Sequence, residues 1–311
     1  MYSSSIELTN HPEIARAHQS ALRSIARIVE NEIPAHDTQY AREGIEHLLY
    51  EGQVLVLTGA GVSTASGIPD YRGESGSLKN HRPMTYQEFR YDDEARQRYW
   101  ARSYVGWRRM RRAEPNAAHY LLTKLEERSQ LAGIITQNVD GLHRRAGSRN
   151  VLTLHGDLEY VVCLICQNRE HRAELDLRIE EKNPGYLERL EDQNLQVNPD
   201  GDVSLSDALI SDFQMVGCTN CQQTFLKPDV VYFGENVPAQ RKTRAWQMYR
   251  DCRSVLVVGS SLAVMSGYKF ALEAHKDQKP LGIINGGPTR ADRKATYMWR
   301  SDVAAALAQL M

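Results

Sequence analysis

The chain has 311 residues, of which 41% are hydrophobic and 25% are charged, and its formal net charge is −1. These proportions are ordinary for a globular protein, and the length suits one large domain or a large domain with a smaller insertion. The near-zero charge excludes a strongly basic nucleic-acid-binding chain, and no apolar run approaches the ~20 residues that a membrane span requires. We therefore expect neither nucleic acid nor a membrane as a partner, and the oligomeric state stays open.

The first part of the chain is expected to be helical. Apolar residues recur at helical spacing through residues 10–33, and Pro34 ends the pattern. We interpret residues 1–45 as a helical N-terminal extension. Residues 1–31 lack a basic region followed by an apolar core, so a secretory signal is not expected and a cytoplasmic location is predicted.

The rest of the chain alternates predicted helices with short apolar strands. A helix over 38–50 precedes the continuous apolar run 54–58, which suits a parallel strand buried on both faces. The same pattern predicts further strands over 133–136, 151–154, 254–259 and 281–285, and helices over 116–128 and 268–275. This alternation predicts an α/β fold with a doubly wound, parallel, Rossmann-like sheet, in which ligands bind beyond the carboxyl ends of the strands.

Two segments interrupt this pattern, and we interpret both as insertions. Residues 73–115 are rich in Arg, Tyr and Trp and are predicted to form a helical module, and residues 157–226 contain most of the cysteines. The main domain, 46–311, then has a Rossmann-like part made of about 46–72, 116–156 and 227–311.

Four of the five cysteines form two CxxC pairs, Cys163–Cys166 and Cys218–Cys221. In a reducing compartment such pairs predict a structural zinc ion held by four thiolates, each pair supplying two sulfur ligands from one turn. Two unrelated cysteine pairs, or a redox-active dithiol, are the alternatives. Cys252 stands alone before an apolar run and is expected to be a small buried hydrophobic residue.

Glycine-rich or polar sequences follow all five predicted strands. They are Gly59-Ala60-Gly61-Val62-Ser63, Gln137-Asn138-Val139-Asp140-Gly141, His155-Gly156, Gly259-Ser260-Ser261 and Asn285-Gly286-Gly287. Glycines allow the backbone to approach a pyrophosphate closely, and we expect a helix after the first glycines whose N-terminus adds amide donors. Thr64 stands where the usual dinucleotide fingerprint has its third glycine, so this match is a variant.

Three further features suggest a ligand site at these strand ends. Asn138 and Asp140, two residues apart, could hold the carboxamide of a nicotinamide ring, or could equally form an Asx-turn that caps the next helix. His155 follows a strand and is a candidate general base near neutral pH. The polar segment 66–72 is predicted to be a mobile loop that could fold over a ligand.

Taken in order, these motifs resemble the sirtuin family of NAD-dependent protein deacylases. The resemblance covers about residue 52 to the C-terminus and includes both CxxC pairs. It rests on Gly59-Ala60-Gly61-Val62-Ser63, Ser66-Gly67-Ile68-Pro69-Asp70-Tyr71-Arg72, Thr136-Gln137-Asn138-Val139-Asp140-Gly141-Leu142-His143, Leu154-His155-Gly156, Lys227-Pro228-Asp229-Val230-Val231-Tyr232-Phe233-Gly234-Glu235 and Gly259-Ser260-Ser261. The wide separation of the CxxC pairs, with Pro199-Asp200-Gly201-Asp202-Val203 between them, resembles the class II branch of that family.

The resemblance implies NAD as the cofactor, a structural zinc ion at Cys163, Cys166, Cys218 and Cys221, and acyl-lysine proteins as substrates. It implies catalytic roles for His155 and Asn138. The implied NAD-binding residues are Gly59, Ala60, Gly61, Ser63, Ile68, Pro69, Asp70, Arg72, Gln137, Asn138, Asp140, Gly259, Ser260, Ser261, Asn285, Gly286 and Val303. The implied substrate residues are Val231, Tyr232, Phe233, Gly234 and Glu235, with an extended substrate chain pairing between a strand at 234–235 and a loop at 265–267.

The resemblance also implies a reaction. The acyl oxygen attacks the anomeric carbon of the nicotinamide ribose and nicotinamide leaves. His155, which must be neutral, then accepts a proton from a ribose hydroxyl, and water finally releases free lysine and 2′-O-acyl-ADP-ribose. A zinc ion closed by four thiolates keeps no position open for chemistry.

The acyl group itself is not determined by these motifs. Tyr99 and Arg102 have the three-residue spacing of family members that remove dicarboxyl acyl groups, but aligning Trp100 with the family's tryptophan places Ser103 and Gly106 at those positions instead. Tyr232 stands where Phe is common, which adds a hydroxyl near the acyl-lysine tunnel. Class II members also suggest lipoyl, biotinyl or branched acyl groups.

Three other functions would use parts of the same sequence. A protein mono-ADP-ribosyltransferase would use the same NAD site with a different acceptor. A hydride-transferring dehydrogenase would need an acidic residue about twenty positions after the glycines, where residues 79–83 offer none. A non-enzymatic zinc-binding module would leave the strand-end residues unexplained.

Overall fold

The computed structural model describes residues 11–30, 33–73, 76–190 and 195–311. The chain divides into two compact units, each with its own sheet. The first comprises Met1–Ala26, Asn80–Arg112 and Gly156–Asn236, and the second comprises Arg27–Lys79, Ala113–His155 and Val237–Met311. Among the helices of the described residues, none combines the length and the hydropathy that a membrane crossing would need.

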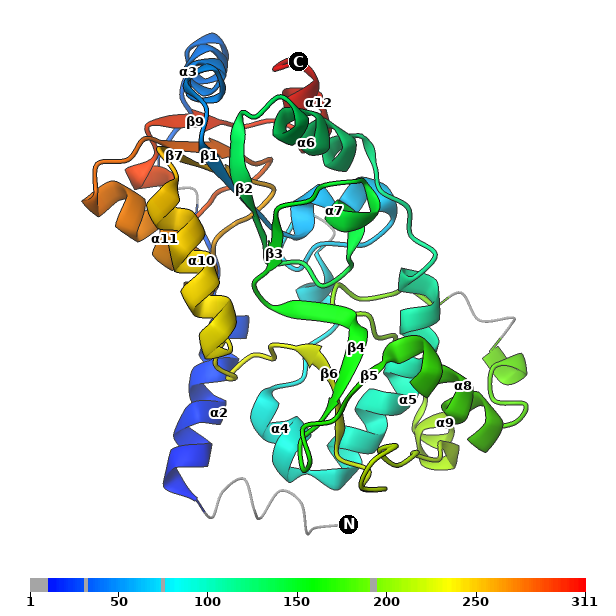
Figure 1. The fold of residues 1–311 in the computed structure, drawn as a ribbon. Coiled ribbons are helices and arrows are strands. Elements are labelled where there is room, and N and C mark those ends of the chain that lie inside the picture. Colours follow the sequence, from blue (N-terminus) through cyan, green and yellow to red (C-terminus); the bar gives the residue numbers. More distant parts are fainter. Residues whose placement is uncertain (1–10, 31–32, 74–75, 191–194) are drawn as a thin grey trace. The chain divides into compact units, whose positions relative to one another are not determined.

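The second unit is built on a six-stranded sheet in which all neighbouring strands are parallel (Figure 1). In spatial order its strands are β3 (Val151–Thr153), β2 (Leu131–Thr136), β1 (Val54–Thr58), β7 (Ser254–Val258), β8 (Leu281–Ile284) and β9 (Tyr297–Trp299). The prediction of an α/β, Rossmann-like parallel sheet is confirmed. Strand β9 was not predicted, because three residues carry too short an apolar pattern.

Helices cover both faces of this sheet, which explains the continuous apolar strands. Along β1, Val54 and Val56 join one core cluster and Leu55 and Leu57 join the other, so successive side chains alternate between two buried faces. The first face packs against α3 (Thr38–Glu51), α6 (Ala117–Glu127) and α12 (Val303–Ala308), and the second against α10 (Ala239–Asp251) and α11 (Met265–Lys276).

The predicted helices of this unit lie within a few residues of their expected bounds. Asp37 caps α3 by accepting a hydrogen bond from the Tyr40 N–H at 3.0 Å, and Gly52 ends it with φ at +72°. Asn116 caps α6 in the same way. The unit also contains the short helices α7 (Leu142–Arg145) and η5 (Asp292–Lys294), together with η3 (Ser77–Lys79).

The strand order defines where a ligand would bind. From β1 the chain passes outward through β2 to β3, and from β7 it passes outward in the opposite direction through β8 to β9. The order therefore reverses between β1 and β7. In doubly wound sheets, a crevice opens at this reversal beyond the carboxyl ends of the strands.

The first unit is built on a smaller antiparallel sheet with the order β5 (Arg169–His171), β4 (Gly156–Cys163) and β6 (Leu226–Val230). Its helices are α2 (Pro12–Ile25), α4 (Tyr86–Tyr91), α5 (Asp93–Met110), α8 (Arg172–Lys182), η4 (Glu188–Leu190) and α9 (Asp207–Asp212). Helix α2 is shorter than the segment 10–33 expected to be helical.

Two segments belong to a different unit from the part of the chain to which we assigned them. Helix α2 lies in the first unit, where it contacts α4, rather than forming a separate extension. Residues 227–236, assigned to the Rossmann-like part, also belong to the first unit, because β6 pairs with β4. Sequence patterns show where strands lie but not which strands pair.

Candidate functional site

The glycines at the ends of β1 and β7 bring two backbones into close contact. The Gly61 N–H donates to the Gly259 carbonyl at 2.9 Å. A Cβ atom on Gly61 would lie 2.9 Å from that carbonyl oxygen, and one on Gly59 would lie 2.7 Å from the Ser260 Cβ. Larger residues would push the strand ends apart at the point where the strand order reverses, so the glycines shape this edge.

The segment after these glycines differs from our expectation. Residues 59–67, which come directly after β1, contain no α-helix. Two 3₁₀ turns, η1 (Ala60–Val62) and η2 (Thr64–Ser66), follow instead, and Gly67 ends the second with φ at +81°. A helix was predicted after these glycines, but the chain forms two 3₁₀ turns before it reaches the polar segment 66–72.

Ser63, Asn138 and Asp140 form one hydrogen-bonded network at the strand ends. The Ser63 hydroxyl donates to Asp140 Oδ2 at 2.7 Å, and the Asn138 amide donates to Ser63 Oγ at 3.0 Å and to the Gly59 carbonyl at 3.1 Å. Burial raises the pKa of Asp140, and its hydrogen bonds oppose that rise. The second oxygen of Asp140 accepts from the Leu142 N–H, so the carboxylate both caps a turn and joins the network.

His155 follows β3 and uses both ring nitrogens. Its Nδ1 lies 3.1 Å from the Gln137 carbonyl, and its Nε2 lies 2.7 Å from Ser266 Oγ. Because a carbonyl oxygen only accepts, Nδ1 carries the proton and Nε2 is the basic nitrogen of the neutral ring. Burial is the main cause that lowers the pKa of His155 to about 4. The hydrogen bond to Gln137 opposes this shift and the charge of Arg241 adds to it. The ring is therefore neutral near pH 7.

Gln137, which follows β2, forms hydrogen bonds with residues at the ends of β1 and β7. Its side-chain amide donates to the Thr58 carbonyl at 3.2 Å and to Ser260 Oγ at 2.8 Å. Gly267 of α11 approaches this side chain so closely that a Cβ atom there would lie 2.4 Å from Gln137 Oε1. The carbonyl that orients His155 is thus held between β1, β7 and α11.

The segment after η2 has no regular structure, as predicted, although its mobility stays a prediction. Ile68 is buried, and Asp70 accepts a hydrogen bond from the Gly73 N–H at 2.7 Å. Arg72 donates to the Arg27 carbonyl. The start of the segment is held by Asn116, whose amide donates to the Val62 carbonyl and to Ser66 Oγ. Asn116 was not predicted as a site residue, and no motif of the sequence indicated this contact.

Three of the implied NAD-binding residues, Asn285, Gly286 and Val303, follow the ends of β8 and β9. The Asn285 N–H donates to the Trp299 carbonyl at 3.2 Å, and a Cβ atom on Gly286 would lie 3.8 Å from the Ser301 carbonyl. Val303 begins α12 and is buried. The structure thus brings Asn285 and Gly286 to the segment that leads into Val303.

The four paired cysteines converge as a metal site requires. Their sulfur atoms all lie within 4.8 Å of one another, with Cys163 Sγ 3.6 Å from Cys221 Sγ and Cys166 Sγ 3.7 Å from Cys218 Sγ. Tetrahedral zinc with Zn–S bonds of about 2.3 Å places its sulfur ligands roughly 3.8 Å apart.

The two CxxC turns have matching backbones. The residue after each pair, Gln167 or Gln222, has φ at +61°, and each turn closes through a hydrogen bond back to the carbonyl of its first cysteine. The chemistry and the spacing of these thiols fit a structural zinc ion. Cys252 is buried, as predicted, and burial raises its pKa.

Comparison with known proteins identifies the family. The model of the Sir2 family matches residues 59–266, which is more than half of the chain. This chain belongs to the Sir2 family. That residue range contains both CxxC pairs and every strand-end motif except the one after β8.

Among its Sir2 relatives, an NAD-dependent protein deacetylase 1 from Corynebacterium efficiens is 56% identical over 271 residues, covering 87% of this chain and 96% of the relative. An NAD-dependent protein deacylase, Sirt4, from Drosophila melanogaster is 39% identical over 290 residues, covering 91% of each. The solved structure of a Sir2 protein with a p53 peptide and NAD⁺ aligns with a TM-score of 0.66 at 30% identity, covering 86% of this chain and 96% of that chain.

The predicted substrate segment of this sirtuin lies in the first unit. Tyr232 is buried, with its ring 5.1 Å from that of Phe89 and 5.5 Å from that of Tyr99. The next residues form a turn, because the Glu235 N–H donates to the Tyr232 carbonyl and Gly234 has φ at +84°. The expected strand at 234–235 is therefore wrong. Residues 265–267, expected to be a loop, form the first turn of α11.

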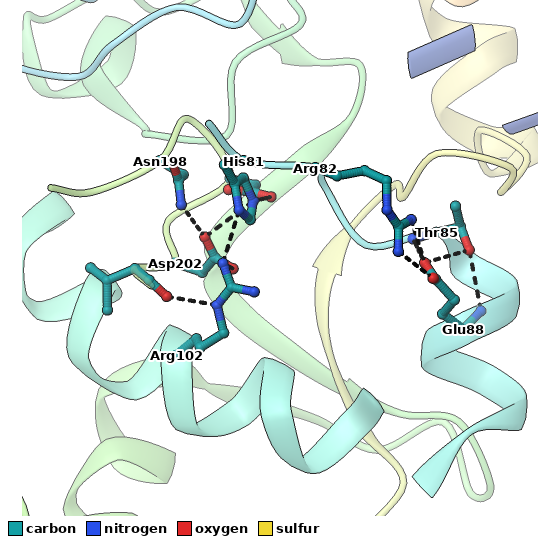
Figure 2. Close-up of polar contacts among 9 residues, drawn as sticks. His81, Arg82, Thr85, Glu88, Arg102, Asn198 and Asp202 are labelled. Atoms are coloured by element: carbon teal, nitrogen blue, oxygen red, sulfur yellow. Dashed lines mark hydrogen bonds and ion pairs between the residues drawn. The ribbon is translucent and has the colours of Figure 1, made fainter. Parts of the chain in front are cut away.

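Arg102, a candidate for binding dicarboxyl acyl groups, is already engaged within the first unit. Figure 2 shows its guanidinium beside Asp202 and His81. It lies 3.2 Å from Asp202 Oδ2, donates to His81 Nδ1 at 2.9 Å, and donates to the Val203 carbonyl at 2.6 Å. A second carboxylate would have to displace Asp202.

His81, Asp200 and Asp202 place three potential metal ligands within 4.8 Å of one another. The Arg102 guanidinium donates to His81 Nδ1, and His81 Nε2 faces the two carboxylates at 3.6–3.7 Å. Arg102 already pairs with Asp202 in this group, so the three side chains form a partly buried cluster of ion pairs and hydrogen bonds.

Proposed function

We propose that this chain removes acyl groups from lysine side chains of proteins in an NAD-dependent reaction. The observation that carries the proposal is a neutral imidazole with an unprotonated Nε2 in the same strand-end region as the network of Ser63, Asn138 and Asp140. Relatives 45–56% identical to it are named NAD-dependent protein deacetylases. NAD, when bound, supplies the ADP-ribosyl group to which the acyl group passes as nicotinamide is released.

The residues of the chain divide this work. The glycine-rich ends of β1 and β7 are close-packed main chain of the kind that approaches phosphates. Asn138 and Asp140, with the buried Ile68, offer an amide, a carboxylate and an apolar wall to a nicotinamide ring. His155 accepts a proton at Nε2, and its carbonyl partner Gln137 holds the ring in the correct tautomer.

The zinc ion has a structural role in this proposal. Four thiolates complete a tetrahedral coordination shell, so no position stays open for water or substrate.

In the first unit, Val231–Glu235 are proposed to contact the acyl-lysine. We also propose a cytoplasmic location, because reduced thiolates are needed to hold the metal.

We further place the chain in the class II branch. Support comes from the relative named Sirt4 and from the long segment 167–217 that separates the two CxxC pairs. Because Arg102 is paired with Asp202, uncharged acyl groups are expected to be better substrates than dicarboxyl ones.

The test is a panel of acyl-lysine peptides incubated with the full chain and NAD, with products followed by mass spectrometry. Free nicotinamide, deacylated peptide and O-acyl-ADP-ribose are expected in equal amounts, most rapidly from uncharged acyl groups. ADP-ribose attached to protein, without deacylated peptide, would instead indicate the mono-ADP-ribosyltransferase. Nicotinamide release with neither product would contradict both functions.

A further inference from the structure

Ser266 forms a hydrogen bond with Nε2 of His155, the ring nitrogen that acts as the base. It lies in the first turn of α11, and its Oγ is 2.7 Å from Nε2. Since Nδ1 donates its proton to the Gln137 carbonyl, Nε2 has only a lone pair to offer, and the serine hydroxyl must be the donor. The basic lone pair of His155 therefore already receives a hydrogen bond from the protein itself.

The placement of Ser266 follows from the packing of α11 on the sheet. Its neighbour Gly267 touches the Gln137 side chain, where any Cβ atom would collide with Oε1. Gln137 in turn is fixed to Thr58 and Ser260. The same residue thus holds Nδ1 through its carbonyl and sets how closely α11 approaches, so both contacts of the imidazole are determined together.

We propose that Ser266 is a proton-relay residue: its hydroxyl passes a proton to Nε2 of His155 and recovers one from the hydroxyl group that the reaction deprotonates. In this step the proton of the Ser266 hydroxyl moves to Nε2 along the hydrogen bond that joins Oγ and Nε2. As the Oγ–H bond breaks and Nε2–H forms, Oγ takes the proton of the substrate hydroxyl. Serine ends neutral, His155 ends as imidazolium, and the substrate oxygen ends as the nucleophile.

The surroundings of His155 favour such a relay. An imidazolium needs an acceptor at each N–H, and Gln137 O and Ser266 Oγ supply the two. A hydroxyl that can both donate and accept serves the neutral and the protonated ring without any movement of the main chain.

This inference rests on the proposed base role of His155. The experiment therefore measures two steps separately: the release of nicotinamide and the transfer of the acyl group. Release of nicotinamide does not require the base, whereas acyl transfer does. Ser266→Ala is expected to lower deacylation about 10- to 100-fold. Exchange of labelled nicotinamide into NAD, measured with acyl-peptide present, is expected to stay within about twofold of the wild type. Ser266→Thr keeps the hydroxyl and is expected to restore deacylation.

Two controls accompany these variants. Ser211→Ala removes an exposed serine hydroxyl of α9 and should change neither rate. Nitrogen NMR of the His155 ring is recorded without NAD. In Ser266→Ala the proton should stay on Nδ1, and the Nε2 resonance should shift because Nε2 has lost its hydrogen-bond donor. That measurement does not depend on activity.

The outcomes are distinct. Ser266→Ala with wild-type deacylation, or Ser266→Thr no better than Ser266→Ala, would overturn the relay while leaving the deacylase function intact. Equal losses of exchange and deacylation in Ser266→Ala would show a general distortion and would also overturn it. A wild-type protein with neither exchange nor deacylation would instead overturn the proposed function.

Discussion

The two units build their functional groups from different parts of the protein chain: main chain at strand ends in one, and clustered side chains in the other. In the second unit, the site is formed by main chain and short side chains at the ends of parallel strands, where Gly61 and Gly259 touch. In the first unit, side chains from distant segments make the functional clusters: two CxxC turns, and Arg102 with Asp202. The first kind of site follows from topology, whereas the second depends on which remote segments come together.

Loss of the metal should have the largest effect on stability, and it tests whether the folding of the first unit depends on its four-cysteine cluster. Cys218→Ser removes one of the four thiolates. Because zinc binding to such sites contributes roughly 10 kcal/mol or more to folding, we expect loss of metal and a large fall in melting temperature. Metal content and thermal unfolding measure this. Cys252→Ser, outside the cluster, should retain its zinc, and a zinc-free, folded Cys218→Ser would remove the structural role of the metal.

The next largest effect concerns the catalytic edge of the second unit. His155→Ala is expected to lower deacylation by about 10²–10⁴-fold, since a general base contributes that much, while NAD binding measured by calorimetry persists. Because the pKa of His155 is lowered to about 4, wild-type turnover should be constant from neutral pH to about pH 5 and fall as pH decreases through about 4, where protonation occupies Nε2. His275→Ala, exposed on α11, is the matched control.

A pH profile with its acidic limb near 6.5 would show that burial does not lower the pKa of His155 in solution. Retained turnover in His155→Ala would remove this residue from the base role altogether. Either result would leave the fold and the zinc site unaffected, so the two units can be judged separately.

A smaller effect is expected from filling the close contact between β1 and β7. Gly61→Ala places a methyl group 2.9 Å from the Gly259 carbonyl, so the strand ends must separate. We expect a loss of about 1–3 kcal/mol in unfolding free energy and weaker NAD binding. Denaturant unfolding and calorimetry measure the two. Gly287→Ala, which has nothing within 4 Å, should change stability little, and equal losses in both variants would contradict a steric cause.

The same contrast explains what could be predicted from the sequence. The apolar run 54–58, the glycines after it and the position of His155 are local patterns, and they predicted five of the six strands and the edge where their ends meet. The pairing of β4 with β6 is not local, so the sequence did not indicate that residues 227–236 lie in the first unit with β4.

The contacts of single side chains were the least predictable. Nothing in the spacing of Ser266 and His155, 111 residues apart, indicates that they touch. The turn at Gly234 and the pairing of Arg102 with Asp202 likewise depend on tertiary packing. The proposed preference for uncharged acyl groups and the proposed proton relay therefore follow from the folded structure and not from the motifs.

The smallest expected effect tests the buried carboxylates of the first unit. Burial, with the nearby charge of Asp200, raises the pKa of Asp202 to about 7, whereas burial lowers the pKa of His143 in the second unit to about 3. Raising the pH from about 4 to 7 therefore removes the stability contributed by Asp202, since the folded state binds the extra proton, and adds the stability contributed by His143, since the unfolded state binds it. These two buried groups therefore contribute to the pH dependence of stability with opposite signs.

Asp202→Asn keeps an acceptor oxygen for Asn198 but cannot ionise. We expect the variant and the wild type to have similar unfolding free energies near pH 4.5. Near pH 7 the variant should be more stable than the wild type, because it keeps the stability that the wild type loses when Asp202 ionises. Urea unfolding across this range measures the difference, and Asp251→Asn, exposed at the end of α10, should show none. If Asp202→Asn is instead less stable at pH 7, the ion pair with Arg102 outweighs the repulsion from Asp200, and the carboxylate is ionised in the folded protein.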